Sequence, residues 1–135
     1  MEHCIEIKVR GYHLDLYSHV NNARYLEFLE EARWAYFESH PSLSALLHSR
    51  NLSLPLVNIN INYRNPACLG NLLRIATTVK KVGNKSAVMD QRIYITDRDI
   101  QAVDAEVTFV LFDNATGRAV EIPDEIRNVL RGMLS

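Results

Sequence analysis

The sequence has few cysteines and no long apolar run. Its 135 residues include two cysteines, Cys4 and Cys68, and two widely separated thiols favour neither a disulfide framework nor a zinc site. No stretch reaches membrane-spanning length, and the first residues lack the basic region and apolar run of a secretory signal. We therefore expect a cytoplasmic protein with no metal site and no membrane partner.

An excess of positive charge is also absent. The sequence has 15 Lys and Arg residues and 16 Asp and Glu residues, which gives a formal net charge of -1. Binding to nucleic acid depends on a basic surface that releases counterions, so we do not expect a nucleic acid partner. A phosphate-bearing ligand would depend on a few local cations. The candidates are Arg64, Lys80, Lys81 and Lys85.

Length and composition predict one folded domain. A hydrophobic fraction of 47% and a charged fraction of 23% exclude the disordered and fibrous classes. The chain is long enough to bury a core without disulfides. Because it contains no internal repeat, low-complexity tract or linker, we expect residues 1–135 to form a single domain.

Hydrophobic periodicity divides the chain into a long helix, five strands and a short helix. Apolar residues at helical spacing predict a helix over residues 23–39, preceded by Asn21 or Asn22 as its cap. Alternating apolar residues predict strands at residues 5–10, 57–64, 73–80, 87–95 and 103–111. Residues 41–54 are expected to form a variable connection, and Pro123 opens a short helix to residue 134.

This order of elements predicts an α+β fold. One strand, one long helix and then four strands in an antiparallel meander place the helix on one face of a sheet. We expect the helix to be mostly enclosed, with Arg33 among its polar residues. Asn58, Asn60 and Asn62 alternate with apolar residues and should face away from the core. Dimerisation would cover the exposed sheet edge.

The densest polar cluster is residues 12–22, just before the long helix. A helix N-terminus has unpaired amides and partial positive charge, so the Asn22 amide is a candidate oxyanion donor. Asp15 could attack a carbonyl or act as a general base. These residues alone leave the function open, since Asp15 and Asn21 could equally cap the loop and the helix. His13 and His19 could be hydrogen-bonded loop histidines.

Residues 15–25, Asp-Leu-Tyr-Ser-His-Val-Asn-Asn-Ala-Arg-Tyr, resemble the D-x-x-G-H-V-N-N-A-x-Y signature of hot-dog thioesterases similar to 4-hydroxybenzoyl-CoA thioesterase. The likeness continues through residues 10–13, 25–34 and 57–64, in particular to bacterial long-chain acyl-CoA thioesterases linked to fatty-acid degradation. It implies an antiparallel five-stranded sheet wrapped around a long central helix. Ser18 replaces the glycine of the signature, which indicates either an ordinary loop conformation or altered substrate clearance.

The resemblance implies hydrolysis of fatty acyl-CoA, with a long chain, to a free fatty acid and CoA. Asp15 would be the nucleophile or general base, and Asn22 would polarise the carbonyl. The acyl chain would lie along the helix at Leu26, Phe28 and Leu29. Residues expected to bind substrate are His19, Asn21, Tyr25, Asn60, Arg64, Lys85 and Ser86.

Subunits of this family share active sites, so the resemblance implies a homo-oligomer, either a dimer or a tetramer. No cofactor is expected, because thiolate is a competent leaving group and CoA is part of the substrate. Two alternatives are a non-catalytic acyl-CoA-binding module and a hot-dog hydratase. Asp15 argues against the first, and the absence of a histidine from residues 23–39 argues against the second.

Overall fold

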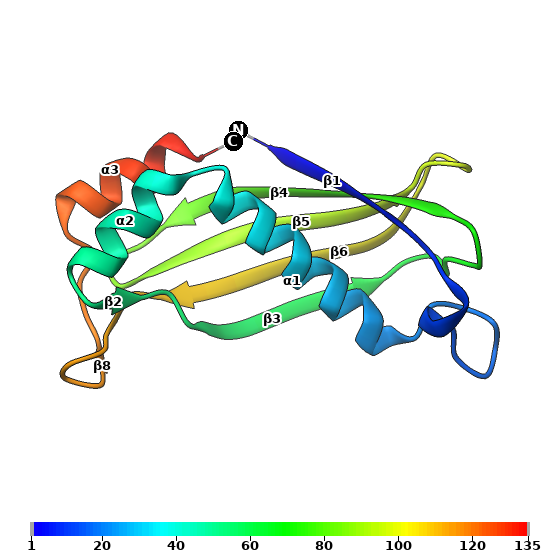
Figure 1. Ribbon diagram of the computed structural model, residues 1–135, viewed down its shortest axis with the longest axis horizontal. Coiled ribbons are helices and arrows are strands. Elements are labelled where there is room, and N and C mark those ends of the chain that lie inside the picture. The colour runs from blue at the N-terminus through cyan, green and yellow to red at the C-terminus, as the bar shows by residue number, and fades with distance from the viewer. Residues whose placement is uncertain (1, 135) are drawn as a thin grey trace.

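The fold consists of a five-stranded antiparallel sheet with one long helix across one of its faces. The structure is a computed structural model, and it describes residues 2–134. The sheet has the order β1-β4-β5-β6-β3, and α1 (Asn22–Glu38) crosses it diagonally (Figure 1). The strands are β1 (His3–Lys8), β3 (Leu56–Tyr63), β4 (Leu72–Val82), β5 (Ser86–Ile95) and β6 (Ile100–Val110).

The core lies between α1 and the inner face of the sheet. Alternation along the strands sorts the two faces: Ile59 and Ile61 pack against the core, whereas Asn58, Asn60 and Asn62 are exposed on the other side, as predicted. Fully buried residues from both layers fill the space between helix and sheet. They include Leu29 and Tyr36 of α1 and Leu73, Ile75, Ile93, Val103 and Val107 of the sheet.

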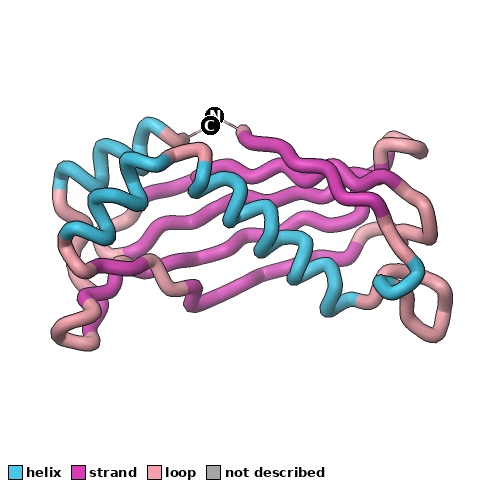
Figure 2. The backbone as a smooth tube through the Cα atoms, in the orientation of Figure 1, coloured by secondary structure: helices cyan, strands magenta, loops and turns pink. Residues whose placement is uncertain are grey.

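The outer face of the sheet is polar and carries ion pairs between strands. Lys80 Nζ lies 2.9 Å from Glu106 Oε1, which joins β4 to β6 across β5. Arg64 Nε lies 2.7 Å from Asp104 Oδ2. This face is defined here by Asn58, Asn60 and Asn62 with these pairs, and no helix within residues 2–134 covers it (Figure 2).

Strand β3 does not lie beside β4, so the predicted four-stranded meander is wrong. β3 pairs with β6, whereas β4 pairs with β1 and β5. Alternation identifies a strand but does not identify its neighbours. Residues 64–71, which connect β3 to β4, are hydrogen-bonded to the segment just before α1, since the Val20 amide donates to the Ala67 carbonyl at 2.9 Å. The chain therefore crosses the end of the sheet, and β1 and β3 become its edges.

Residues 41–54, expected to form a variable connection, contain a helix and a short strand. The helix α2 (Pro41–Ser49) starts with a proline, a residue favoured at the first helical position. A small second sheet follows, formed by β2 (Leu52–Ser53), β7 (Phe112–Asp113) and β8 (Arg118–Ala119). The helix α3 (Asp124–Gly132), which was expected, packs beside α2 (Figure 2).

Tyr36 joins α1 to the sheet and to the end of α3. The pairing of β4 with β5 is shifted between Val79 and Lys81. At this β-bulge the Val79 amide donates to the Tyr36 hydroxyl at 3.2 Å, and the hydroxyl donates to the Met133 carbonyl at 3.1 Å. Burial raises the pKa of Tyr36, so the hydroxyl remains a donor at neutral pH.

Replacing Tyr36 with Phe should lower the free energy of unfolding by about 1–3 kcal/mol, because it leaves the Val79 amide without its acceptor. Urea denaturation would measure the change. Tyr17→Phe is the matched control, since Tyr17 is 75% exposed. Equal losses in the two variants would contradict the assigned role of the Tyr36 hydroxyl.

Candidate active site

The loop before α1, formed by residues 14–20 and called the Asp15 loop, is organised by backbone hydrogen bonds and by one carboxylate. Leu14 and Val20 form a bridge at its base, and the Asp15 amide donates to the His19 carbonyl at 2.8 Å. Asp15 Oδ1 accepts hydrogen bonds from the amides of Tyr17 at 2.9 Å and His19 at 3.3 Å. Asp15 Oδ2 makes no hydrogen bond within residues 2–134. One carboxylate oxygen therefore holds the loop, and the other is available to a ligand.

Ser18 adopts the backbone conformation that favours glycine. Its φ angle is 62°, in the left-handed region. The sequence left two alternatives for Ser18, an ordinary loop conformation or altered substrate clearance, and the φ angle excludes the first. Serine therefore occupies a conformation that glycine adopts without strain, and it adds a side chain at an exposed position beside His19.

The start of α1 presents an unpaired amide. Asn21 is the N-cap, and its Oδ1 accepts from the Ala23 amide at 2.9 Å. The Asn22 amide has no hydrogen-bond partner among the described residues, and Asn22 is exposed. Its carbonyl accepts from the Tyr63 hydroxyl at 3.0 Å, which fixes the helix start to β3. The Asn22 amide is therefore a hydrogen-bond donor with a fixed position at the positive end of the helix dipole.

His13 supports this loop from within. The Arg10 amide donates to its Nδ1 at 2.9 Å, and the Asn21 amide donates to its carbonyl at 2.9 Å. The ring packs edge-on against Phe28 with centroids 4.9 Å apart. Burial, assisted by the charge of Arg24, lowers the pKa of His13. The ring is therefore neutral in the folded protein at neutral pH.

The remaining residues predicted to bind substrate are spread over the molecule. His19 is exposed within the Asp15 loop, and its backbone forms a bridge with Cys68. Tyr25 is buried, and its hydroxyl accepts from the Ala67 amide at 3.0 Å. Arg64 follows β3 and pairs with Asp104 on the outer face.

Asn60, Lys85 and Ser86 lie away from the loop. Asn60 lies in the middle of β3 on the outer face. Lys85 and Ser86 are at the turn between β4 and β5, at the opposite end of the sheet from the Asp15 loop (Figure 1). The 11 residues of β4 separate these ends by roughly 30 Å. A single chain therefore does not bring Lys85 and Ser86 to Asp15.

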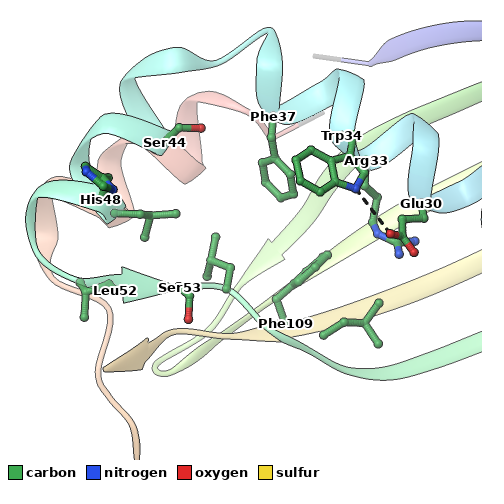
Figure 3. A pocket seen from close by; sticks show the side chains of 12 residues that line it. Glu30, Arg33, Trp34, Phe37, Ser44, His48, Leu52, Ser53 and Phe109 are labelled. Carbon is green, nitrogen blue, oxygen red and sulfur yellow. Dashed lines mark hydrogen bonds between the residues drawn. The ribbon is translucent and has the colours of Figure 1, made fainter. Parts of the chain in front are cut away.

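A cavity of about 640 Å³ opens between the C-terminal half of α1, α2 and the start of β3 (Figure 3). This volume is typical of small-molecule sites. Trp34, Phe37, Leu47 and Phe109 form part of its apolar wall. Trp34 follows Asn22 by twelve residues, a helical distance of about 18 Å. The cavity and the Asp15 loop are therefore separate within one chain.

Phe28 and Leu29, predicted to contact an acyl chain, are instead buried in the core. Their side chains are 5% and 0% exposed, which leaves no surface for a ligand. Leu26 is partly exposed but does not line the cavity. Two other apolar residues of α1, Trp34 and Phe37, form part of the cavity wall instead.

A buried polar network connects Arg33, which lines the cavity, to β4 and β5. Arg33 Nη1 donates to Gln91 Oε1 at 3.1 Å, and Gln91 Nε2 donates to the Leu29 carbonyl at 2.9 Å and to Thr77 Oγ1 at 3.0 Å. Arg33 is 9% exposed, so its predicted place on the polar face is wrong: the side chain reaches β5 beneath the helix. Burial lowers the pKa of Arg33, and the charge of Glu30 opposes this.

Three other features bear on the class of protein. Residues 2–134 contain no group of three or more His, Cys, Asp or Glu side chains that could hold a metal ion. No helix in this range is long and apolar enough to cross a bilayer. Cys4 and Cys68 are both free thiols.

The sheet order, the helix across one face and the polar loop at the helix start define the hot-dog fold of thioesterases. A sequence profile described as the Thioesterase-like superfamily matches residues 9–130, and the chain belongs to this family. The protein is therefore an enzyme that hydrolyses thioesters. The predicted fold and enzyme class are both confirmed.

Particular relatives support this assignment. The chain is 46% identical over 129 residues to the long-chain acyl-CoA thioesterase FadM of Escherichia coli (strain K12), covering 96% of this chain and 97% of that protein. The structure of YbaW, a probable thioesterase from Escherichia coli, matches with a TM-score of 0.87 and 44% identity over 98% of each chain. Slr0204, a 1,4-dihydroxy-2-naphthoyl-CoA thioesterase from Synechocystis, shares the fold with a TM-score of 0.82 at 20% identity, covering 97% and 96% of the two chains.

Replacing His13 with Asn should make stability less sensitive to acid, because Asn keeps an acceptor near the position of Nδ1 and cannot gain a proton. The pKa of His13 is lower in the folded chain than its ordinary value of 6.5, so the unfolded chain binds more protons. Wild-type stability should therefore be full above about pH 6.5 and fall as the pH drops towards the lowered folded pKa.

The free energy of unfolding in urea, measured between about pH 7.5 and about pH 5, would test this linkage. His48→Asn is the control at an exposed histidine. The same acid sensitivity in wild type and His13→Asn would show that His13 does not couple protonation to folding.

Proposed function

We propose that the protein hydrolyses acyl-CoA thioesters, with Asp15 as the catalytic carboxylate and the Asn22 amide as the oxyanion donor. The supporting observation is that a free carboxylate oxygen lies in a loop held by backbone hydrogen bonds, and that a free amide begins the helix directly after this loop. The similarity to FadM, whose name specifies long-chain acyl-CoA, supports CoA esters with long acyl chains as substrates.

Two routes are compatible with this arrangement. Asp15 Oδ2 attacks the thioester carbon directly, and water then cleaves the resulting anhydride. Alternatively, Oδ2 takes a proton from a water molecule that attacks the same carbon. In both routes the carbonyl oxygen gains negative charge near the Asn22 amide, the C–S bond breaks, and the CoA thiolate leaves and is protonated. Neither route requires a metal or redox cofactor.

The proposed active site is shared between two copies of the chain, with the loop of one copy near the cavity of the other. Supporting this, the cavity lies about 18 Å along α1 from Asn22 in the same chain. The edge strand β3 and the exposed side of α1 also present a set of large apolar residues. These are Leu26, Trp34, Leu56, Val57 and Tyr63, which are 37% to 62% exposed.

A homodimer through this side, or a tetramer made of two dimers, would cover these residues. Within such an assembly we propose that His19, Asn21, Tyr25, Asn60, Arg64, Lys85 and Ser86 contribute to substrate binding, with Arg64 and Lys85 near the phosphates of CoA. The two free thiols support a place in the reducing cytoplasm.

Replacing Asp15 with Asn should lower kcat at least about a hundredfold, because the amide keeps the acceptor for the Tyr17 and His19 amides but is neither a base nor a nucleophile. Thiol release from acyl-CoAs between acetyl-CoA and palmitoyl-CoA would measure this change and the chain-length preference. Asp124→Asn, at an exposed position in α3, is the control.

Full activity of Asp15→Asn would contradict the role of the carboxylate. If the wild-type protein instead binds acyl-CoA tightly and releases no thiol from any substrate, the chain is a binding module rather than an enzyme. Circular dichroism would establish that each variant has folded.

Replacing Asn22 with Pro should lower kcat by about a hundredfold to a thousandfold, because it removes the proposed oxyanion donor. Proline is accepted at the first position of a helix. Asn21 already has the extended conformation that must precede proline, with φ -60° and ψ 136°. Asn22→Ala keeps the amide and is expected to keep most of the activity. Similar kinetics in the two variants would rule out this donor.

A further inference from the structure

Arg33 is a buried cation in a cavity whose walls are mostly apolar. A guanidinium carries five N–H donors, and the single hydrogen bond of Arg33 within residues 2–134 is the one from Nη1 to Gln91. Nε and Nη2 have no hydrogen-bond partner there, yet neither is sealed from solvent. Because Arg33 lines the cavity, these donors are available to a molecule bound in it.

Gln91 fixes the orientation of this guanidinium. Gln91 is fully buried, and its Nε2 donates both to the Leu29 carbonyl and to Thr77 Oγ1. Turning the amide over would lose both hydrogen bonds and would place an NH₂ group against Arg33. Oε1 must therefore point towards Arg33. It accepts the hydrogen bond from Nη1, and the edge of the guanidinium formed by Nε and Nη2 stays unpaired.

No carboxylate oxygen of the described chain lies within 4.0 Å of Arg33. Glu30, one turn earlier, accepts instead from the Trp34 indole at 3.5 Å (Figure 3). An unpaired guanidinium edge in a mostly apolar wall matches an oxygen acceptor, and a carboxylate matches it with two parallel hydrogen bonds. A plain hydrocarbon chain offers no acceptor and would leave the edge unpaired.

We infer that Arg33 is a specificity-determining residue that selects acyl groups carrying an acceptor oxygen remote from the thioester. The inference rests on the proposed function, in which this cavity receives the acyl chain. Suitable acyl groups carry a hydroxyl, a keto group or a second carboxylate. The carboxylate engages both free donors, whereas a hydroxyl or keto oxygen engages one.

The first test compares kcat/KM for dodecanoyl-CoA, its mid-chain and ω-hydroxy derivatives, and the monothioester of dodecanedioic acid with CoA. The wild-type enzyme should prefer at least one oxygenated substrate by about tenfold or more, as expected for hydrogen bonds to a charged group. Arg33→Met should abolish this preference, because it lowers kcat/KM for the oxygenated substrates more than it lowers kcat/KM for dodecanoyl-CoA. Arg131→Met, at an exposed arginine of α3, should change neither.

The second test measures binding without catalysis. Trp34 is the one tryptophan of the sequence and lines the cavity, so its fluorescence should report occupancy. Methyl dodecanoate and the monomethyl ester of dodecanedioic acid differ only by a terminal carboxylate. Wild type should bind the acid more tightly, and Arg33→Met should bind the two alike. If Arg33→Met does not fold, Arg33→Lys keeps the charge without the planar edge and should reduce the preference.

The outcomes separate this inference from the proposed function. If dodecanoyl-CoA is hydrolysed and no oxygenated substrate is preferred, Arg33 does not select the acyl chain, although the proposed function stands. A loss of activity in Arg33→Met that is equal for all substrates would likewise reduce Arg33 to a structural residue. If no thioester is hydrolysed, the proposed function fails, and equal binding of the two esters to wild type would overturn the inference as well.

Discussion

The placement of α1 across the sheet is the constraint on which the other features of this protein depend. Leu29, Ala32 and Tyr36 recur at helical spacing and are buried against the sheet. The helix start is held by the Asn21 cap and by the hydroxyl of Tyr63. Near its other end, Tyr36 bonds to β4 and to the end of α3. Because both ends are fixed, the Asp15 loop and the cavity keep a constant separation along one rigid element.

Features that depend on local periodicity could be predicted from the sequence. The alternation of residues 57–64 identified β3, and the helical spacing of residues 23–39 identified α1 to within one residue at each end. The motif at residues 15–25 indicated the family, which the comparisons confirm. Pro41 with Leu43, Leu46 and Leu47 also carried a usable signal for α2, since a proline followed by apolar residues at helical spacing is typical of a helix start.

Features that depend on distant segments could not be predicted. The pairing of β3 with β6 joins strands that periodicity treats as independent. Arg33 has the same sequence context as an exposed helical arginine, and its burial depends on Gln91, 58 residues later. The cavity wall combines α1, α2 and the end of β6, so no single segment of the sequence reveals it.

The polar outer face of the sheet limits how copies of this protein can associate. A second sheet laid flat on Asn58, Asn60 and Asn62 and on the Lys80–Glu106 and Arg64–Asp104 pairs would have to remove water from charged groups, and the attraction regained would offset only part of that cost. Contact over this face would therefore be hydrated and weakened by added salt. Contact along the apolar side of α1 and β3 would not be weakened by added salt. The dependence of association on ionic strength would therefore distinguish the two kinds of contact.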